Sequence, residues 1–430
     1  MVAGAKQVDL EAWEFFLRRA VLAAGARVME EILEEVGCGR RREPVVCSCG
    51  ECMSSVGVRE KKIRTILGMV PFRRSLFICP ACGEARIPGD ELLNIKHTGF
   101  SPGARRLMVH AGSRTSFIDA EEDLQLYANL DVDRRDIERV AEGVGESIEA
   151  WMKQQDAEVL EQAEHISVEP VEKDIPMLYV AFDGTGIPMR REDLKGRKGK
   201  SPDGSAKTRE VKLGCSFTQT TCDEDGRPVR DPDSTTYVGA IENSDCFGWR
   251  IYAEALRRGL DHAENVVVLT DGAVYNKSIV QMHFPGAIHI IDLYHAREHI
   301  CEIAKLLLPE DKRQWHEAKW LALLDEGKIE NLIERIDSHI PRRGKKRKEA
   351  LLGISYLRDN ADRMRYADFR SRGFFVGSGV IEAGCRTVVG QRLKKSGMFW
   401  SVDGANAIIA ARCCLHSRRF DDFWEERAAA

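Results

Sequence analysis

Two apolar segments of the sequence each end on an aspartate that is followed by glycine. Residues 177–183, MLYVAFD, end at Asp183, and residues 265–271, NVVVLTD, end at Asp271. Both segments have the pattern of buried β-strands, and ligands of α/β sheets bind beyond the carboxyl ends of the strands. The two carboxylates could therefore meet at one sheet edge and hold a hard cation such as Mg²⁺, which prefers oxygen ligands. Taken singly, each Asp-Gly pair is also ordinary turn chemistry.

A third acidic residue, Glu382, lies in a glycine-rich segment that is expected to open a helix. Two divalent cations about 4 Å apart can clamp the attacking and leaving oxygens of a phosphoryl displacement. A third carboxylate is then needed to hold the pair, and Glu382 is the candidate. Alternatively, Glu382 could pair with Arg386 one turn further along the same helix.

The region around Glu382 also carries a family resemblance. Residues 377–412, GSGVIEAGCRTVVGQRLKKSGMFWSVDGANAIIAAR, resemble the signature of the ISKra group of bacterial insertion-sequence transposases. The segments VAFDGTGIPMR and VVLTDGA stand where that family carries its first and second acidic residues. The resemblance covers roughly residues 45–415. It implies a DDE-type transposase with an RNase H-like core, in which Asp183, Asp271 and Glu382 are catalytic and bind Mg²⁺ (or Mn²⁺), two ions in all.

The same resemblance implies the reaction and the partners. The enzyme would cleave DNA at insertion-sequence ends and transfer the freed strand in a metal-dependent reaction. Its partners would be double-stranded DNA, at the transposon ends and at the target, and further copies of the chain in a synaptic complex, as a homo-oligomer. A non-catalytic DNA-binding protein derived from a transposase is an alternative, and the intact acidic triad argues against it.

Cysteines gather at two places between residues 47 and 82. Cys79 and Cys82 form a Cys-x-x-Cys turn, which presents two thiolates to one tetrahedral Zn²⁺. Spacing favours Cys49 with Cys52 as the other pair. A glycine after the second ligand instead favours Cys47 with Cys49, so both pairs remain open. In either case the pattern predicts a structural zinc site, rather than unliganded buried cysteines.

The segment DLYHAREHIC offers a rival zinc chemistry. His295, Glu298 and His299 have the spacing of an inverted zincin motif, which is typical of metallopeptidases. The motif begins at the end of an expected strand, residues 287–295, and not inside a helix, so a chance match is the better interpretation. We instead expect Asp292 and His295 to support the carboxylate site from the neighbouring strand end.

Local basic clusters could contact DNA although the chain as a whole is balanced, with 64 Lys and Arg against 68 Asp and Glu. Contacts of Lys and Arg with phosphates supply most of the affinity for DNA. The candidates lie between the two cysteine clusters, in the loop after Asp183 and on the helix of Glu382. They are Arg59, Lys61, Lys62, Arg64, Arg73, Arg74, Lys198, Lys200, Arg392, Lys394 and Lys395. Each cluster could also be a solvated surface.

The elements that must position these residues change character along the chain. Residues 9–36 are expected to form a helix, because Trp13, Phe16 and Leu17 begin an apolar pattern at helical spacing. From residue 177 the pattern becomes α/β. The 111 residues from Asp271 to Glu382 (382 − 271) are too many for one crossover and predict a helical insertion.

The fold class that follows is an α/β catalytic core, an RNase H-like mixed sheet with a helical insertion, preceded by a zinc-ribbon and helical DNA-binding region. The expected boundaries are 1–44 for an N-terminal helical segment, 45–90 for the zinc ribbon, 91–170 for a helical DNA-binding region, 171–295 for the first part of the core, 296–372 for the insertion, and 373–430 for the second part of the core with the catalytic helix and tail.

Composition excludes several other classes. A chain of 430 residues that is 43% hydrophobic is long enough for two or three domains and is not disordered. No apolar run reaches the roughly 18 residues of a membrane span, and the first residues lack the apolar core of a secretion signal. Thirteen cysteines in uneven clusters fit a reducing cytosol. We therefore expect a cytoplasmic, nucleoid-associated protein with no membrane partner.

Overall fold

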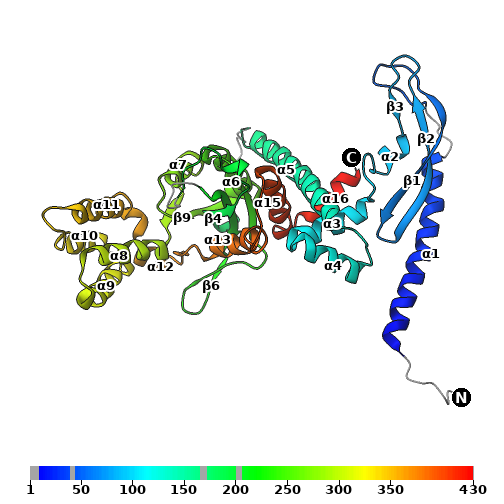
Figure 1. Cartoon of the computed structure of the whole chain (residues 1–430). Coiled ribbons are helices and arrows are strands. Elements are labelled where there is room, and N and C mark those ends of the chain that lie inside the picture. Colours follow the sequence, from blue (N-terminus) through cyan, green and yellow to red (C-terminus); the bar gives the residue numbers. More distant parts are fainter. Residues whose placement is uncertain (1–8, 39–43, 165–171, 200–205, 430) are drawn as a thin grey trace. The chain divides into compact units, whose positions relative to one another are not determined.

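The chain is mixed α/β, and its computed structural model describes residues 9–38, 44–164, 172–199 and 206–429 (Figure 1). It divides into two units, residues 1–141 and 142–430. The division falls inside a long helix, α5 (Arg134–Glu164), which therefore contributes to both units. In the described part of the chain, no helix is long and apolar enough to cross a membrane.

The first unit is built on a three-stranded antiparallel sheet in the order β1-β2-β3. β1 (Ser54–Thr65) and β2 (Gly68–Ile78) form a hairpin, and the short β3 (Ala85–Arg86) pairs with the end of β2. Gly68 has a φ of 124°, which residues with a side chain rarely adopt, so glycine permits the tight hairpin turn. Three helices follow the sheet in the chain: α2 (Pro88–Leu92), α3 (Pro102–Arg114) and α4 (Phe117–Ala128).

The helix predicted near the N-terminus is confirmed as α1 (Leu10–Cys38). Its second half packs against β2. The backbone of Gly37 comes so close to β2 that a Cβ at this position would lie 2.4 Å from the carbonyl oxygen of Arg73. Leu33 of this half joins a buried cluster that contains Ile63, Val70, Phe72 and Ile95.

The first half of α1 does not bury the apolar side chains that predicted it. Trp13, Phe16 and Leu17 are 59%, 67% and 60% exposed. Arg18 donates a hydrogen bond to the carbonyl oxygen of Tyr127 and so ties this half to the end of α4. Helical periodicity therefore identified the helix correctly, but it did not identify a buried face over these residues.

The second unit contains a five-stranded mixed sheet in the order β10-β9-β4-β5-β8. β5 is antiparallel to both β4 and β8, whereas β9 is parallel to both β4 and β10. The two strands that the sequence predicted to end on aspartates are therefore direct neighbours, β4 and β9. The strands are β4 (Ile175–Pro188), β5 (Thr208–Thr218), β8 (Thr236–Ala240), β9 (Ala263–Thr270) and β10 (Ile288–Ile291). A separate small hairpin joins β6 (Thr221–Cys222) to β7 (Pro228–Val229).

Helices cover both faces of this sheet. Because side chains alternate along a strand, Leu213 and Gly214 of β5 face opposite sides. A Cβ at Gly214 would lie 2.6 Å from Ile251 of α6 (Ser244–Arg257), so α6 covers that face. α13 (Gly379–Gly384) covers the other face, where its last residue approaches Leu213.

The region between β10 and α13 is helical. The strand expected at 287–295 is shorter than predicted, since β10 ends at Ile291. Asp292 ends it by capping the next helix: its Oδ1 accepts a hydrogen bond from the backbone N–H of His295 at 2.6 Å. The helices are α8 (Leu293–Leu307), α9 (Glu310–Asp325), α10 (Ile329–Asp337), α11 (Lys345–Asp359), the 3₁₀ turn η3 (Ala361–Met364) and α12 (Tyr366–Ser371).

After α13 the chain continues into a π-helical segment, Cys385–Gly390, and a last turn, α14 (Gln391–Leu393). Widened turns of this kind often occur at functional sites. The chain then closes the unit with α15 (Val402–His416) and α16 (Phe420–Ala429).

Candidate active site and metal centre

Asp183 and Asp271 lie at the same edge of the five-stranded sheet. β4 and β9 run in parallel, and Phe182 is aligned with Thr270. Asp271 follows the last residue of β9, as predicted, whereas Asp183 lies within β4 and does not end it, because β4 continues to Pro188 by pairing with β5. Since Phe182 packs edge-on against a ring of α6, the next side chain on β4, Asp183, points to the opposite face, which is the face covered by α13.

Asp271 is held by the turn that leads from β9 into α7 (Val274–His283). Its Oδ1 accepts a hydrogen bond from the backbone N–H of Ala273 at 3.0 Å and another from the side-chain amide of Asn276. Asn276 is almost completely buried, so its side chain fixes the orientation of the carboxylate. This contact gives Asp271 a defined position without any ion.

Gly272 is required for a different reason than turn geometry. A Cβ at this position would lie 2.1 Å from the hydroxyl oxygen of Tyr356. Tyr356 belongs to α11, so the helical region between β10 and α13 reaches the edge of the sheet directly beside Asp271. The glycine of the Asp-Gly pair therefore makes room for an aromatic side chain that the sequence alone does not place here.

Asp183 lies in an acidic and partly buried environment. Burial raises the pKa of Asp183 above its ordinary value, the N–H of Gly184 lowers it, and the charges of Asp271 and Glu382 raise it further. Its Oδ2 lies 3.9 Å from the Cys385 thiol. Asp271 and Glu382 therefore both act electrostatically on Asp183, and a bound cation would relieve the cost of ionising the Asp183 carboxyl.

Glu382 is presented by α13 from above the sheet. Its Oε1 accepts a hydrogen bond from the Ser378 hydroxyl at 2.6 Å. α13 can approach because Gly384 has no side chain: a Cβ there would lie 2.6 Å from the ring of Tyr237. The carboxylate is exposed, and is thus available to a ligand in solvent.

Asp292 connects the loop before α13 to the start of α8. It is 3% exposed, and its Oδ2 accepts a hydrogen bond from the backbone N–H of Ser378 at 2.5 Å. Ser378 in turn holds Glu382, so Asp292 acts on the third acid of the site. The sequence placed Asp292 beside Asp271, and the backbone N–H of Asp292 does bond to the carbonyl oxygen of Thr270 at 2.8 Å, while its side chain reaches toward the residues that hold Glu382.

His295 lies on α8 with its Nδ1 3.9 Å from the carboxylate of Glu298. Its charge acts on Asp183 and tends to lower the pKa of that carboxyl, which agrees with a place near the acidic site. The ring of His299 stands edge-on to it, with centroids 4.9 Å apart. Burial lowers the pKa of His299, and the charge of His295 lowers it further.

The inverted zincin motif therefore lies on a helix, contrary to the expectation that it would begin on a strand. His295 and His299 both belong to α8. A catalytic zinc needs three protein ligands. Among the described residues, however, no third histidine, cysteine or carboxylate comes close enough to complete a set with them.

The ligand oxygens of the three acids do not all lie within 4.8 Å of one another, as the atoms of a preformed metal site would. Within the described ranges, the one group of three or more ligand atoms that all lie within 4.8 Å is formed by cysteines. Asp271 is turned toward Asn276, and Glu382 toward Ser378. Like charges repel, so separate partners for each carboxylate are the arrangement expected of the protein alone.

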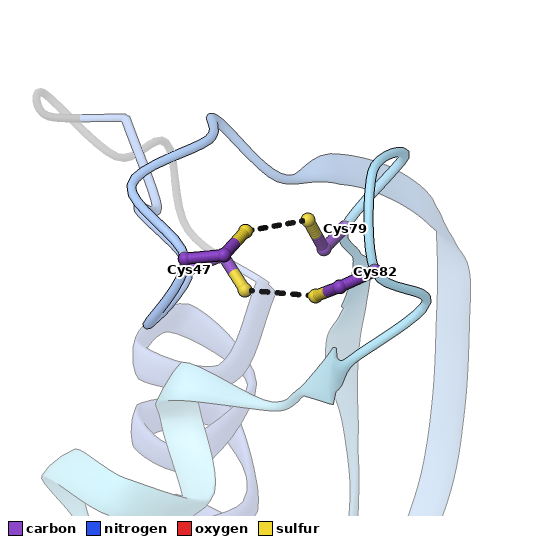
Figure 2. A group of neighbouring side chains, drawn as sticks. Cys47, Cys79 and Cys82 are labelled. Carbon is purple, nitrogen blue, oxygen red and sulfur yellow. Dashed lines mark hydrogen bonds between the residues drawn. The ribbon is translucent and has the colours of Figure 1, made fainter.

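That group of cysteines is Cys47, Cys49, Cys79 and Cys82. Figure 2 shows the cluster with Cys47, Cys79 and Cys82 labelled. The sulfur atoms of Cys47 and Cys82 are 3.4 Å apart, and those of Cys49 and Cys79 are 3.6 Å apart. Zinc–sulfur bonds of about 2.3 Å in a tetrahedron require sulfur atoms roughly 3.8 Å apart. The four thiols therefore fit a structural Zn²⁺.

Two similar turns build this cluster. In each turn a glycine with positive φ donates its N–H to the carbonyl oxygen of the first cysteine: Gly50 to Cys47 and Gly83 to Cys79, both at 3.0 Å. The structure thus groups Cys47 with Cys49, the pair that the position of glycine favoured. Cys52 lies outside the group, because after this turn the chain returns as a strand and Cys52 pairs with Val46.

The thiols of the cluster differ in their surroundings. The backbone N–H of Cys49 tends to lower the pKa of Cys47, but a hydrogen bond to Glu84 and burial raise it to about 12. Backbone N–H groups, first that of Cys82, lower the pKa of Cys79 to about 7. Cys79 is therefore the thiol that is most readily available as a thiolate.

Two of the six hairpin cations proposed for DNA, Lys61 and Arg74, are buried in contacts inside the first unit, which corrects the expectation for these two. Lys61 and Arg74 form ion pairs of 3.1 and 2.7 Å with Asp90, and all three side chains are at most 14% exposed. Arg73 pairs with Glu34, and Arg64 pairs with Asp131. Arg59 and Lys62 remain exposed on β1.

The basic residues proposed for DNA in the second unit also differ in exposure. Arg392 is fully buried and lies over the ring of Trp400, so it cannot contact DNA, contrary to expectation. Lys394 is exposed and donates to the Thr185 hydroxyl at 2.5 Å, two residues beyond Asp183. Lys198 is exposed, Lys395 is half-buried, and Lys200 lies outside the described residues.

Several residues of the site were not predicted from the sequence. Cys385, Asn276, Ser378 and Tyr356 all lie at the acidic edge or hold its carboxylates. For Asn276 a signal existed, because an amide five residues after a strand-end aspartate falls on the first turn of the next helix. For Tyr356, 85 residues beyond Asp271 (356 − 271), no local signal exists.

Comparisons with known proteins add little to this site. No protein-family model matches the chain. No curated protein matches it either. Among solved structures, the chain is similar to the Drosophila P element transposase strand transfer complex, at 9% identity over 77% of this chain and 81% of that one. The TM-score of 0.24 is too low for this likeness to carry an argument about fold or function.

Proposed function

We propose that this chain is a DDE-type transposase of the ISKra group, with an RNase H-like catalytic core in its second unit. The reaction would be cleavage of DNA at insertion-sequence ends and transfer of the freed strand into target DNA. This proposal rests on the resemblance of residues 377–412 together with the geometry of the acidic edge.

The observation that supports it most is the meeting of three acids from distant parts of the sequence. Asp183 and Asp271 lie on neighbouring parallel strands, the first and fourth of the sheet in chain order, where the pairing of these two strands ends at Phe182 and Thr270. Glu382 arrives on a later helix over the same face and acts electrostatically on Asp183. Three carboxylates gathered in this way are an arrangement that a divalent cation stabilises.

The donor set suits Mg²⁺ or Mn²⁺, since all three candidate ligands are carboxylates. Bound there, two such ions would supply activation of water, and then of a 3′-hydroxyl, for attack on a phosphodiester. The protein's own part is to hold the ligands. Asn276 fixes Asp271, and the contacts from Asp292 through Ser378 fix Glu382.

The first unit would bind DNA as a folded, zinc-containing module. Zn²⁺ would be held by Cys47, Cys49, Cys79 and Cys82. Arg59, Lys62 and Arg73 are hairpin cations with exposed side chains that could contact phosphates. The residues from 91 to 170 remain proposed as a helical DNA-binding region, and assembly on two transposon ends would require further copies of the chain.

The deciding experiment is strand cleavage by the purified full chain on DNA that carries the ends of its own element. With Mg²⁺, the wild type should nick at the element boundary, while Asp183→Asn, Asp271→Asn and Glu382→Gln should each cut at least about a thousandfold more slowly, because several kcal/mol of metal-dependent stabilisation are lost.

The matched control is Asp311→Asn, which neutralises an exposed acid on α9, outside the triad and outside the His295–His299 motif. All four variants should keep DNA affinity, because phosphate binding depends on Lys and Arg. Wild-type cleavage by any of the triad variants would exclude this chemistry. Peptidase activity lost in both His295→Ala and His299→Ala would favour the zincin alternative.

A further inference from the structure

A cavity of about 350 Å³ lies beside the sheet edge formed by β10, between α7 and η3. Its wall carries Lys277 from α7, His289 from β10 and Arg363 from η3, together with Gln281. No aspartate or glutamate lines it. The cavity therefore presents two cations and two neutral hydrogen-bonding side chains.

The acidic groups that act on Arg363 do not line the cavity. Asp359 and Asp362 act electrostatically on Arg363, but neither is part of the wall. Arg363 donates a hydrogen bond to the carbonyl oxygen of Asp359 at 2.9 Å, through one of its two terminal nitrogens. That contact orients the guanidinium of Arg363 and uses only one of its terminal nitrogens.

His289 is neutral at neutral pH. Burial, followed by the charges of Arg363 and Lys277, lowers the pKa of its ring to about 3. Both cations thus act on the same ring from the cavity. The negative charge that would balance them is not supplied by the wall.

The cavity is connected to the proposed active site by two hydrogen bonds. His289 Nε2 lies 2.8 Å from the Thr270 hydroxyl, and that hydroxyl donates to the carbonyl oxygen of Asp271 at 2.7 Å. A hydroxyl has one hydrogen, so Nε2 must donate to Thr270, which leaves Nδ1 as the acceptor of the ring. An occupant of the cavity would thus lie two hydrogen bonds away from the backbone of a catalytic acid.

We propose that this cavity binds a phosphate group through Lys277 and Arg363. The guanidinium offers paired donors that match phosphate oxygens, and the ammonium adds a compact second charge. Gln281 can donate a further hydrogen bond. The source to which we assign the phosphate is the backbone of DNA that passes the acidic edge, and this assignment rests on the proposed function.

Two probes separate the possible sources of the phosphate. The first is inorganic phosphate, compared with chloride at equal ionic strength, and the readout is the melting temperature of the full chain. The second is a DNA duplex, and the readout is the slope of log affinity against log salt. The test variant is Lys277→Ala/Arg363→Ala. The control, Lys312→Ala/Arg370→Ala, removes the same charge from exposed positions on α9 and α12.

If the cavity holds a DNA phosphate, the test variant should lose the phosphate-dependent rise in melting temperature. Its salt slope should also fall by about 1 to 2, while the control keeps both. Loss of the phosphate response with an unchanged slope would still support a phosphate site, and would identify free phosphate or a nucleotide as its source.

Responses to both probes that equal those of the wild type would overturn the proposal. The variant Lys277→Arg keeps the charge and should retain the phosphate response of the wild type. Its behaviour distinguishes loss of the charge from a general defect in folding. Neither readout depends on cleavage. Failure here therefore leaves the triad experiment untouched, and loss of the triad chemistry would leave the phosphate response intact.

Discussion

The cysteine cluster and the acidic edge are both candidate metal sites, and they differ in how nearly complete they are without an ion. Four sulfur atoms already lie within 4.8 Å of one another, with two pairs at 3.4 and 3.6 Å. The three carboxylates each have their own partner in the protein. The cysteine cluster is built by two local turns, whereas the acidic edge is assembled by the tertiary fold.

Charge and chain distance explain the difference. A thiol can be neutral, so four cysteines can approach with little repulsion, and each pair lies within one short turn closed by a glycine. Carboxylates are ionised at neutral pH, so they repel unless a cation lies between them. They also arrive from strand ends and a helix separated by 88 and 111 residues (271 − 183 and 382 − 271).

The largest effect is expected from the cysteine cluster. Cys79→Ser, Cys82→Ser, Cys47→Ser and Cys49→Ser should each release zinc and unfold the hairpin region, because structural zinc contributes on the order of 10 kcal/mol to a small domain. Zinc content and protease resistance of the full chain report this. Cys52→Ser is the matched control and should retain one equivalent of zinc. Loss of zinc from Cys52→Ser would instead reassign the first pair of ligands.

A second effect tests how α13 is positioned over the sheet. Gly384→Ala would place a methyl group 2.6 Å from Tyr237, and overpacking of this kind costs about 1–3 kcal/mol. Cleavage should fall more than DNA affinity, because Glu382 moves with the helix. Gly379→Ala, at the other end of α13, has no atom within 4 Å of the added Cβ and should be silent. Equal effects of the two variants would show that helix propensity, and not contact with Tyr237, is responsible.

A smaller effect concerns pH and the metal-free acidic edge. Burial, and then the charges of Asp271 and Glu382, raise the pKa of Asp183, so the folded chain keeps that proton to higher pH than the unfolded chain does. Metal-free stability should therefore fall as pH rises above the ordinary aspartate value of 3.8. Asp183→Asn should melt a few degrees higher than the wild type at pH 7, on the scale of about 1 kcal/mol, and the gain should vanish near pH 4.

Binding of Mg²⁺ should stabilise the wild type at pH 7 for the same reason that Asp183→Asn does, because both remove repulsion at the acidic edge. Added Mg²⁺ should raise the melting temperature of the wild type at pH 7 and should have less effect on Asp183→Asn. If Asp183→Asn raises the melting temperature by the same amount at pH 4 and at pH 7, the ionisation of Asp183 is not the cause of the stabilisation.

The smallest effects distinguish two neighbouring lysines of β1. Lys62→Ala removes an exposed charge and should lower the salt slope of DNA binding by about 1, with little change in stability. Lys61→Ala leaves Asp90 with one cation fewer in a buried cluster and should destabilise the first unit, with the slope unchanged. Fluorescence anisotropy at several salt concentrations and thermal melts give both readouts. The reverse pattern would restore Lys61 as a DNA contact.

The sequence by itself determined the elements that carry local patterns. The apolar strand segments before Asp183 and Asp271, and Cys-rich turns with glycine after the second ligand, are encoded within stretches of about ten residues, whereas the continuation of β4 past Asp183 to Pro188 depends on its pairing with β5. Short-range spacing is enough for these, because strand pattern and turn geometry depend on adjacent residues.

Only the tertiary structure decided which of these residues meet and which charges are free. It buried Lys61 and Arg74 against Asp90, enclosed Arg392, and left Trp13 and Phe16 exposed although they predicted a helix. It also brought Tyr356 to Gly272 and joined Asp292 through Ser378 to Glu382. A charge or an apolar side chain has the same local pattern whether its partner is solvent or a distant segment, so burial and pairing are settled only when the chain is folded.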